Sequence, residues 1–426
     1  MFKTLFSFVA LFWAVLLLLT GVGLLSTFLS LRMTVEGFSA QTTGLVMSSY
    51  FVGLVLGSLV CHHLVHRVGH IRAFAAFAAF CTAAVMVHGL WLSPFSWAIL
   101  RLITGMSITG LYMVIESWLN ECTQPGERGR IFSVYMVITY LGLGCGQFLL
   151  GVAEIHQQIH LLVVGILFSL CLIPVSVTRS IHPEPPERVQ FNLRVIFRIA
   201  PLGLIGCLTA GILNSTLYTM GPVFAYRMGL PVSQISLFMG IIIISGLLLQ
   251  YPVGFLSDLF DRNIVLGLLG FGTAVTAVSM ALLSEHSIFI LFGLGGIYGG
   301  IAFTVYPVSV AHSHDFFDPP DIVAVSSALI MSFGIGASIG PLLAARFMAP
   351  PLGPEGMFLF IAAVGFLYGG FVFWFRHKRP ERLAVEEPVP FMVARSTSPV
   401  AAALDPRSEP SDAEEIERQL YHKNRA

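Results

Sequence analysis

The amino-acid sequence predicts an all-α membrane protein with twelve transmembrane helices in two pseudo-symmetric six-helix bundles. Of its 426 residues, 56% are hydrophobic and only 11% are charged, whereas soluble proteins carry about 25% charged residues. Apolar runs of about 20 residues, the length that crosses a bilayer as a helix, recur along the chain. The two halves of the chain also repeat each other. The formal net charge of zero gives no support for a nucleic-acid partner.

The expected spans fall into two sets of six. Since only helices and closed barrels satisfy their backbone in lipid, and these runs are too long and too apolar for barrel strands, we expect every span to be helical. The first run is also too long for the apolar region of a cleaved signal peptide. The spans lie near residues 5–31, 43–65, 73–92, 95–119, 131–153 and 161–179, and then near 199–225, 235–256, 264–283, 288–311, 322–347 and 357–376.

A polar break divides the two sets. Residues 180–198 are rich in proline and charge, so we expect a cytoplasmic linker between an N-terminal bundle, 1–179, and a C-terminal bundle, 199–376. Residues 377–426 are dominated by proline, serine and charge. Such a composition predicts a disordered cytoplasmic tail.

The halves match each other at a nearly constant offset. Leu29–Met33 (LSLRM) resembles Phe224–Met228 (FAYRM) at an offset of 195 residues, and Gly53 corresponds to Gly246 at 193. Parallel repeats of this kind build transporters whose substrate site lies between the halves, near the middle of the membrane. The glycine clusters also correspond: Gly142, Gly144 and Gly146 with Gly334, Gly336 and Gly340.

Basic residues indicate the orientation. Loops rich in lysine and arginine face the cytoplasm, and in the predicted topology the rich side includes both chain ends. We therefore expect a multi-pass protein of the cell inner (plasma) membrane with both termini cytoplasmic. The rich side carries Lys3, Arg67, Arg72, Arg128, Arg130, Arg179, Arg188, Arg194, Arg198 and Arg262, while the other side carries Arg32, Arg227 and Arg346.

The fourth span carries a polar stripe in the stretch Arg101–Leu119. At about 100° per residue, Arg101, Gly105, Thr109, Tyr112 and Glu116 share about one quarter of the helix circumference. A charge in hydrocarbon costs several kcal/mol by most scales, so the stripe is expected to face other helices or water inside the protein. Arg101 and Glu116 are about 22 Å apart along the axis, and each needs its own partner.

Each of these two charges has two interpretations. Arg101 is either a ligand-binding or coupling residue, or a structural arginine that donates to backbone carbonyls. Glu116 is either a proton carrier or part of a structural charge cluster with Arg67, Arg72 or Arg128.

Other polar residues lie on spans seven and ten. Tyrosine and asparagine can orient a ligand by hydrogen bonds, although polar contacts between membrane helices are also common. The candidate cavity or coupling residues are Arg101, Thr109, Tyr112, Glu116, Asn214, Tyr218, Tyr298 and Tyr306.

A loop motif suggests a family. Gly254–Arg262 (GFLSDLFDR) resembles the G-x-x-x-D-R-x-G-R signature of the major facilitator superfamily, which follows the second helix of each half. In the first half, histidines replace the first glycine and the aspartate of this signature. The expected gating-loop residues are Arg67, Gly69, Gly254, Asp258 and Arg262.

Further stretches resemble the same superfamily. Arg101-x-x-x-Gly105 is similar to its fourth-helix signature, and Gly142–Gly146 partly resembles the glycine signature of exporters, without its proline. The likeness covers residues 5–376 and implies a central cavity lined by the first and fourth helices of each half. Three stretches resemble a bacterial subgroup typified by YcaD: Val46–Gly53, Val114–Ser117 and Tyr306–Val308.

We therefore expect a secondary active transporter that moves a small organic solute by alternating access, coupled to protons and favouring export. Apart from the lipid bilayer, the solute and protons, no partner is expected, and the resemblance implies a monomer. We expect no enzyme activity, because the spans carry no Ser/His/Asp or paired-carboxylate arrangement. We also expect no cofactor or metal. The alternative function is a transporter-like membrane sensor that binds a ligand without translocating it.

Overall fold

In the computed structural model the described residues, 2–123, 126–177, 193–318, 321–378 and 391–404, form helices and connecting segments. Twelve helical segments within these ranges are long and apolar enough to cross a membrane, as predicted. The N-terminal half contains α1 (Phe2–Val35), α2 (Ala40–Val68), α3 (His70–His88), α4 (Pro94–Cys122), α5 (Arg128–Phe148), η1 (Leu149–Val152), α6 (Ile159–Leu170) and α7 (Leu172–Val177). The C-terminal half contains α8 (Leu193–Ile199), α9 (Pro201–Arg227), α10 (Val232–Leu259), α11 (Arg262–Leu283), α12 (Ile288–Ala302), α13 (Val305–His314), α14 (Ile322–Phe347) and α15 (Gly356–Lys378), with η4 (Pro399–Leu404) near the end of the chain.

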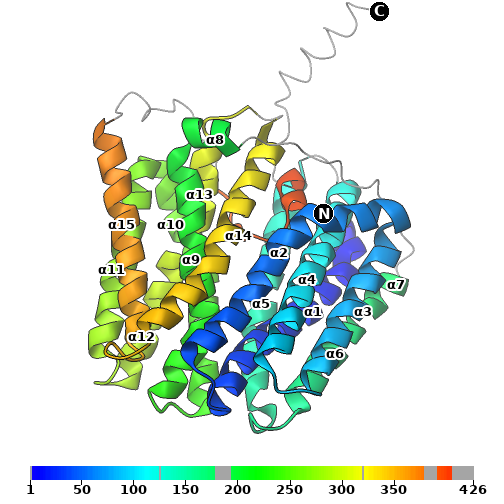
Figure 1. The fold of residues 1–426 in the computed structure, drawn as a ribbon. Helices are drawn as coiled ribbons and strands as arrows, with labels where there is room; N and C mark the ends of the chain where they lie inside the picture. The colour runs from blue at the N-terminus through cyan, green and yellow to red at the C-terminus, as the bar shows by residue number, and fades with distance from the viewer. Residues whose placement is uncertain (1, 124–125, 178–192, 319–320, 379–390, 405–426) are drawn as a thin grey trace, which may run out of the picture.

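The helices form two bundles side by side, which confirms the predicted fold class. In Figure 1 the N-terminal half lies on the right and the C-terminal half on the left. Helix α1 begins and α15 ends on the same side of the molecule, the upper side of Figure 1, which we call the terminal side. The other side is called the opposite side.

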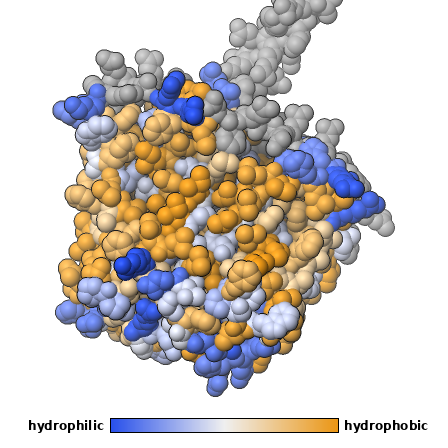
Figure 2. All heavy atoms as spheres, in the orientation of Figure 1, coloured by the Kyte–Doolittle hydropathy of each residue, from blue (hydrophilic) through white to orange (hydrophobic). Residues whose placement is uncertain are grey.

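The surface matches a membrane environment. On the face shown in Figure 2, hydrophobic residues dominate the middle, and most hydrophilic residues gather toward the upper and lower edges. Large apolar side chains such as Phe289, Tyr251 and Leu367 are exposed. A water-soluble protein rarely exposes contiguous apolar surface of this extent, whereas lipid tails solvate it.

Close glycine contacts show that the repeat is structural. A Cβ atom on Gly23 would lie 2.5 Å from the backbone oxygen of Leu143, so α1 and α5 pack with their backbones in contact. In the second half, a Cβ on Gly211 would lie 2.1 Å from the backbone oxygen of Phe333, between α9 and α14. Small residues permit such close approach of membrane helices. The same packing device therefore recurs in both bundles.

Span ten is not one continuous helix, although the sequence predicts a single run at 288–311. It is divided into α12 and α13 at Phe303 and Thr304. Pro307 explains the break, because proline lacks an N–H and its ring clashes with the carbonyl four residues earlier, that of Phe303. Span six is likewise divided into α6 and α7.

The two halves meet directly on the opposite side. The hydroxyl of Ser236 on α10 donates to the backbone oxygen of Gln147 on α5 at 2.5 Å. A Cβ on Gly44, near the start of α2, would lie 2.7 Å from the backbone oxygen of Pro341 on α14. On the terminal side, by contrast, residues 391–404 lie between the halves, and η4 packs against α4, α5 and α14.

This segment departs from the predicted disorder of 377–426. Residues 391–404 pack into the bundle, and α15 continues to Lys378. The physical reason is local composition: from Pro388 to Leu404 the only charged residue is Arg395, so the stretch can be buried. Residues 379–390 and 405–426 lie outside the described residues, as do residues 178–192, which include 180–192 of the predicted linker 180–198. The last residues of this linker lie in α8.

Candidate functional site

A pocket lies between the two halves, where the repeat predicts a substrate site. Helices α2, α4 and α5 line it from one half, and α9, the α12–α13 break, α13 and α14 from the other. Residues of the C-terminal segment also line it, and about 40 Å³ of free space remains. The lining residues are Tyr50, Phe51, Leu54, Tyr112, Tyr140, Asn214, Ser215, Tyr218, Phe303, Tyr306 and Phe333, together with Ala394, Arg395 and Ser396 of the segment.

Glycine packing and the helix break place the aromatic residues. A Cβ on Gly105 would lie 2.1 Å from the backbone oxygen of Tyr50, so α2 and α4 touch and both direct tyrosines to the pocket. In the other half, the break in span ten places Phe303 against Tyr218, with ring centroids 5.3 Å apart. The amide of Gln250 donates to the hydroxyl of Tyr140 at 2.6 Å, which joins α10 to α5 at the pocket wall.

Arg395 brings a cation into this aromatic pocket. Its guanidinium carbon lies 6.0 Å from the ring centroid of Tyr140 and 5.8 Å from that of Tyr218, one ring from each half. Cation–π contacts at such distances contribute about 0.5–2 kcal/mol each. Burial by itself lowers the pKa of the guanidinium, but the tyrosine hydroxyls, Tyr112 foremost, offset this and hold the pKa above its ordinary value.

Glu116 lies beside the pocket and is fully buried at 0% exposure. The hydroxyl of Tyr135 on α5 donates to its Oε1 at 2.9 Å, and the hydroxyl of Ser398 donates to its Oε2. Within the described part of the chain, no basic side chain forms an ion pair with this carboxylate. Its partners are therefore hydroxyls rather than the arginine cluster of the structural alternative.

Arg101 is buried at 1% exposure and does not line the pocket. Its guanidinium carbon lies 4.3 Å from the ring centroid of Tyr50, and Tyr50 itself lines the pocket. Its Nε and Nη2 atoms have no hydrogen-bond partner among the residues that the structure describes. Arg101 thus supports a pocket tyrosine while these two donors are unused.

The other sequence candidates separate into two groups. Tyr112, Asn214, Tyr218 and Tyr306 line the pocket together. Thr109, in contrast, donates to the backbone oxygen of Leu54 at 3.1 Å and packs between α2 and α4. Tyr298 is buried at the interface of α12 with α9, and its hydroxyl lies 3.5 Å from the backbone oxygen of Leu213.

The loop-motif residues form a charge network in the second half. Arg262 pairs with Asp258 at 2.7 Å and with Asp315 on the end of span ten. The backbone N–H of Phe391 donates to both carboxylate oxygens of Asp258 at 3.0 Å, and its ring occupies the space where a Cβ on Gly254 would lie. The motif therefore holds the start of the C-terminal segment.

In the corresponding loop of the first half, no carboxylate pairs with Arg67 in the part of the chain that the structure describes. Gly69 separates α2 from α3 with a φ of 82°, a left-handed conformation that favours glycine. Arg67 is exposed on the terminal side. The histidines that replace the glycine and aspartate thus leave a turn without the acidic anchor of the second half.

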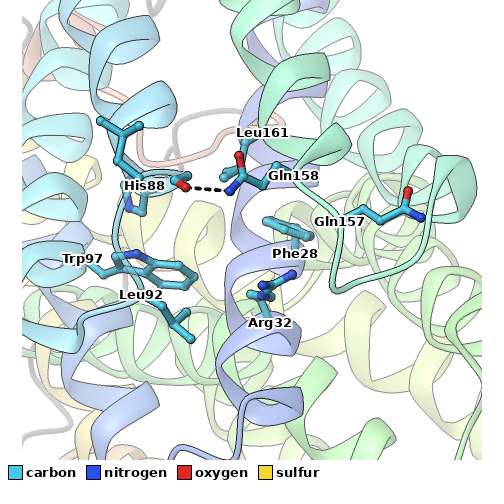
Figure 3. Close-up of a pocket in the computed structure, with 10 residues that line it drawn as sticks. Phe28, Arg32, His88, Leu92, Trp97, Gln157, Gln158 and Leu161 are labelled. Atoms are coloured by element: carbon cyan, nitrogen blue, oxygen red, sulfur yellow. Dashed lines mark hydrogen bonds between the residues drawn. The ribbon is translucent and has the colours of Figure 1, made fainter.

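A second pocket of about 200 Å³ lies on the opposite side, within the N-terminal half (Figure 3). His88 and Trp97 form one wall, and Phe28 and Arg32 of α1 form another. The amide of Gln158 donates to the backbone oxygen of Gly89 at 2.7 Å across its edge. All its lining residues belong to one half of the molecule, so it does not lie between the two bundles.

Several site residues were not predicted. Tyr50, Tyr140 and Gln250 lie on spans two, five and eight, whereas the resemblance directed attention to the first and fourth helix of each half. Arg395 and Ser398 lie in the tail 377–426, whose composition predicts disorder throughout. The residues around Arg395 carry no other charge and are far more apolar than the rest of the tail, and this local composition could have indicated a buried segment.

Two repeated six-helix bundles around one polar, aromatic pocket define a membrane transporter. The Major Facilitator Superfamily model matches residues 11–284 and 228–410. Proteins described as "Uncharacterized MFS-type transporter YcaD" from Salmonella typhimurium (strain LT2) and Salmonella typhi are 30% identical over 362 residues, which cover 83% of this chain and 91% of the relatives. The chain belongs to the Major Facilitator Superfamily, in its YcaD-like subgroup.

Solved structures share the fold. A bacterial homologue of the human lysosomal transporter Spinster, in an inward-facing and unoccupied conformation, matches with a TM-score of 0.74 at 14% identity, covering 89% of this chain and 98% of that one. The nucleoside transporter NupG matches with a TM-score of 0.71 at 14% identity, covering 88% and 99%. The D-xylose–proton symporter matches with a TM-score of 0.66 at 14% identity, covering 86% and 97%.

Proposed function

We propose that this transporter moves a small organic solute across the cell inner membrane by alternating access at the pocket between its halves. The observation that carries the proposal is that both bundles contribute to one aromatic and polar pocket, with Tyr112 from one half and Tyr218 from the other. In transporters built from parallel repeats, relative rocking of the halves exposes such a site to each side in turn. The bundles 1–179 and 199–376 are the proposed moving units of a monomer.

We propose that Glu116 couples transport to protons. A buried carboxylate without a counter-charge is costly to ionise, and Glu116 is held by the hydroxyls of Tyr135 and Ser398. Such a group can hold a proton while the pocket is closed and release it when the terminal side is open to water. The D-xylose–proton symporter couples transport to protons, as its name states. This chain is similar to it in fold.

The terminal side is proposed to be cytoplasmic, because the basic loops lie there. Export is the proposed direction. The support is the glycine-rich end of α5, where a Cβ on Gly146 would lie 2.4 Å from the backbone oxygen of Thr20. This end of α5 is packed too closely against α1 for a larger side chain, as the resemblance to exporters leads us to expect.

The test has two stages. A thermal-shift screen of the purified protein against metabolites and drugs finds a binder, since a ligand stabilises the folded state by mass action. Flux of that binder is then followed in proteoliposomes with and without an imposed pH gradient. Movement that depends on the gradient supports proton-coupled transport. Binding without flux under any gradient would instead favour the sensor alternative.

A further inference from the structure

The C-terminal segment, residues 391–404, is anchored to both halves of the transporter. At its start, the N–H of Phe391 donates to both carboxylate oxygens of Asp258 in the second half. Near its end, Ser398 donates to Glu116 in the first half. Relative movement of the halves on the terminal side therefore requires this segment to detach from at least one of them.

Between these anchors, Arg395 occupies the pocket. Tyr140 of the first half and Tyr218 of the second face its guanidinium at 6.0 and 5.8 Å. Tyr50 and Tyr112 line the same space. The electron-rich faces of aromatic rings attract cations, with tyrosine among the better partners.

The rest of the lining suits the same chemistry. Apart from Arg395, the lining residues of the pocket carry no charged side chain, and they offer hydroxyl and amide acceptors. The Oδ1 atom of Asn214 has no hydrogen-bond partner among the described residues. A ligand that carries N–H donors on a positive charge would satisfy this acceptor and the aromatic faces together. The buried carboxylate of Glu116, one helical turn from Tyr112, adds an acidic group beside the pocket.

The free volume of the pocket is too small for the segment and a solute to bind at the same time. With the segment in place the pocket retains about 40 Å³, whereas sites for small organic ligands typically span about 300–1,000 Å³. Residues 379–390 join the segment to α15 in the same chain. The segment therefore competes as an intramolecular ligand, and a free solute meets a strong competitor.

We propose that the pocket binds small organic cations with N–H donors, of the guanidinium class, and that residues 391–404 compete for the same pocket through Arg395. The proposal rests on the proposed function in taking this pocket as the transport site. In this arrangement the transporter is inhibited by its own C-terminal segment until a cationic solute, at sufficient concentration, displaces it. The segment then leaves the space that the halves need in order to close on the terminal side.

The test measures binding rather than transport. N-acetyl-L-arginine methylamide copies the chemistry of residue 395, and N-acetyl-L-citrulline methylamide has the same shape without the charge. Isothermal titration of the full-length protein in nanodiscs compares the unchanged chain with Arg395→Gln, Arg395→Lys and Arg346→Gln. Arg346 is an exposed arginine on the opposite side and serves as the matched control.

We expect Arg395→Gln to bind the arginine probe at least tenfold more tightly than the unchanged chain, because its competitor is weakened. Arg395→Lys should fall between these two proteins, since the lysine keeps a positive charge that attracts aromatic faces but lacks the planar guanidinium. Arg346→Gln should behave as the unchanged chain, and the citrulline probe should bind to none of them. Equal affinity of Arg395→Gln and the unchanged chain, or equal binding of both probes, would overturn the proposal.

A peptide of residues 391–404 gives a second measurement that does not depend on the folding of a variant. Added to the Arg395→Gln protein, it should displace the arginine probe, while the same peptide with glutamine at position 395 should not. Displacement by both peptides would contradict the role of Arg395. Transport of an uncharged solute with no binding of the arginine probe would reject this inference but leave the proposed transport function intact. Binding of the probe without flux of any solute would reject the transport function but leave cation binding at the pocket intact.

Discussion

The hydroxyl of Ser398 donates a hydrogen bond to the carboxylate of Glu116, although the two residues are 282 positions apart in the chain. The acid on the fourth span is thus in direct contact with the C-terminal segment. Its other hydroxyl partner, Tyr135, belongs to the same half. If the segment leaves the pocket as proposed, Glu116 loses the hydrogen bond from Ser398.

Glu116→Gln tests the coupling role. The amide keeps the shape of the side chain but cannot release a proton, so we expect at least a tenfold loss of accumulation driven by a pH gradient. Proteoliposome flux at several pH values measures this. Glu121→Gln is the matched control, because Glu121 is an exposed acid on the same helix. Unchanged gradient-driven flux together with lower protein abundance would support a structural role.

Arg101→Met separates function from structure at a buried cation. Burying a charge without a counter-charge is costly, and two donors of Arg101 have no partner in the described structure. We expect an unchanged or higher melting temperature and at least a threefold loss of ligand affinity, since Tyr50 loses its support. A lower melting temperature with normal binding would show instead that the arginine is structural.

Gly105→Ala tests the packing that places the tyrosines. The new Cβ would lie 2.1 Å from the backbone oxygen of Tyr50, and overpacking of this kind costs about 1–3 kcal/mol. We expect a lower melting temperature in detergent. Gly370→Ala on α15 is the control, because nothing lies within 4 Å of its Cβ position. If both variants melt at the same temperature, the backbones of α2 and α4 are not in the contact described.

Arg262→Ala tests the charge network that anchors the segment. The side chain of Asp315 is only 4% exposed, and leaving such a charge without its partner costs about 3–5 kcal/mol. Arg376→Ala breaks the ion pair with Asp261. The side chain of Arg376 is 37% exposed and that of Asp261 is 23% exposed, and such partly exposed pairs contribute about 0–1 kcal/mol. Thermal unfolding should therefore show a large loss for the first variant and a small one for the second. Similar losses would indicate that burial of Asp315 is not decisive.

Much of the fold could be predicted because the membrane imposes it. A bilayer requires about 20 apolar residues per helix, so the number of spans was visible in the sequence, and the offset between Gly53 and Gly246 showed the repeat. The break in span ten was less visible, because Pro307 acts on the carbonyl of a residue four positions earlier, in a run that is apolar throughout.

The site was predicted less completely because it depends on contacts between distant segments. Tyr112, Asn214, Tyr218 and Tyr306 were recognised as polar residues on pocket-lining spans, whereas Tyr50 and Tyr140 lie on spans two and five, which were not expected to line the cavity. The C-terminal segment is too short to cross a membrane, and composition alone could not reveal that its partners are Asp258 and Glu116. Only the folded arrangement brings these charges to its two ends.

The central claim is that the two bundles rock around the pocket and that the C-terminal segment keeps them apart on the terminal side. Measuring the distance between the halves on that side tests this claim most directly. Non-canonical amino acids that carry spin labels replace Ser133 of α5 and Leu259 of α10, which are both exposed. Pulsed electron paramagnetic resonance then measures the distance between the two labels. The account predicts one long distance in the unchanged chain and an additional shorter one in Arg395→Gln, where the halves can close. A single, identical distance in both proteins, unaltered by saturating arginine probe, would contradict it.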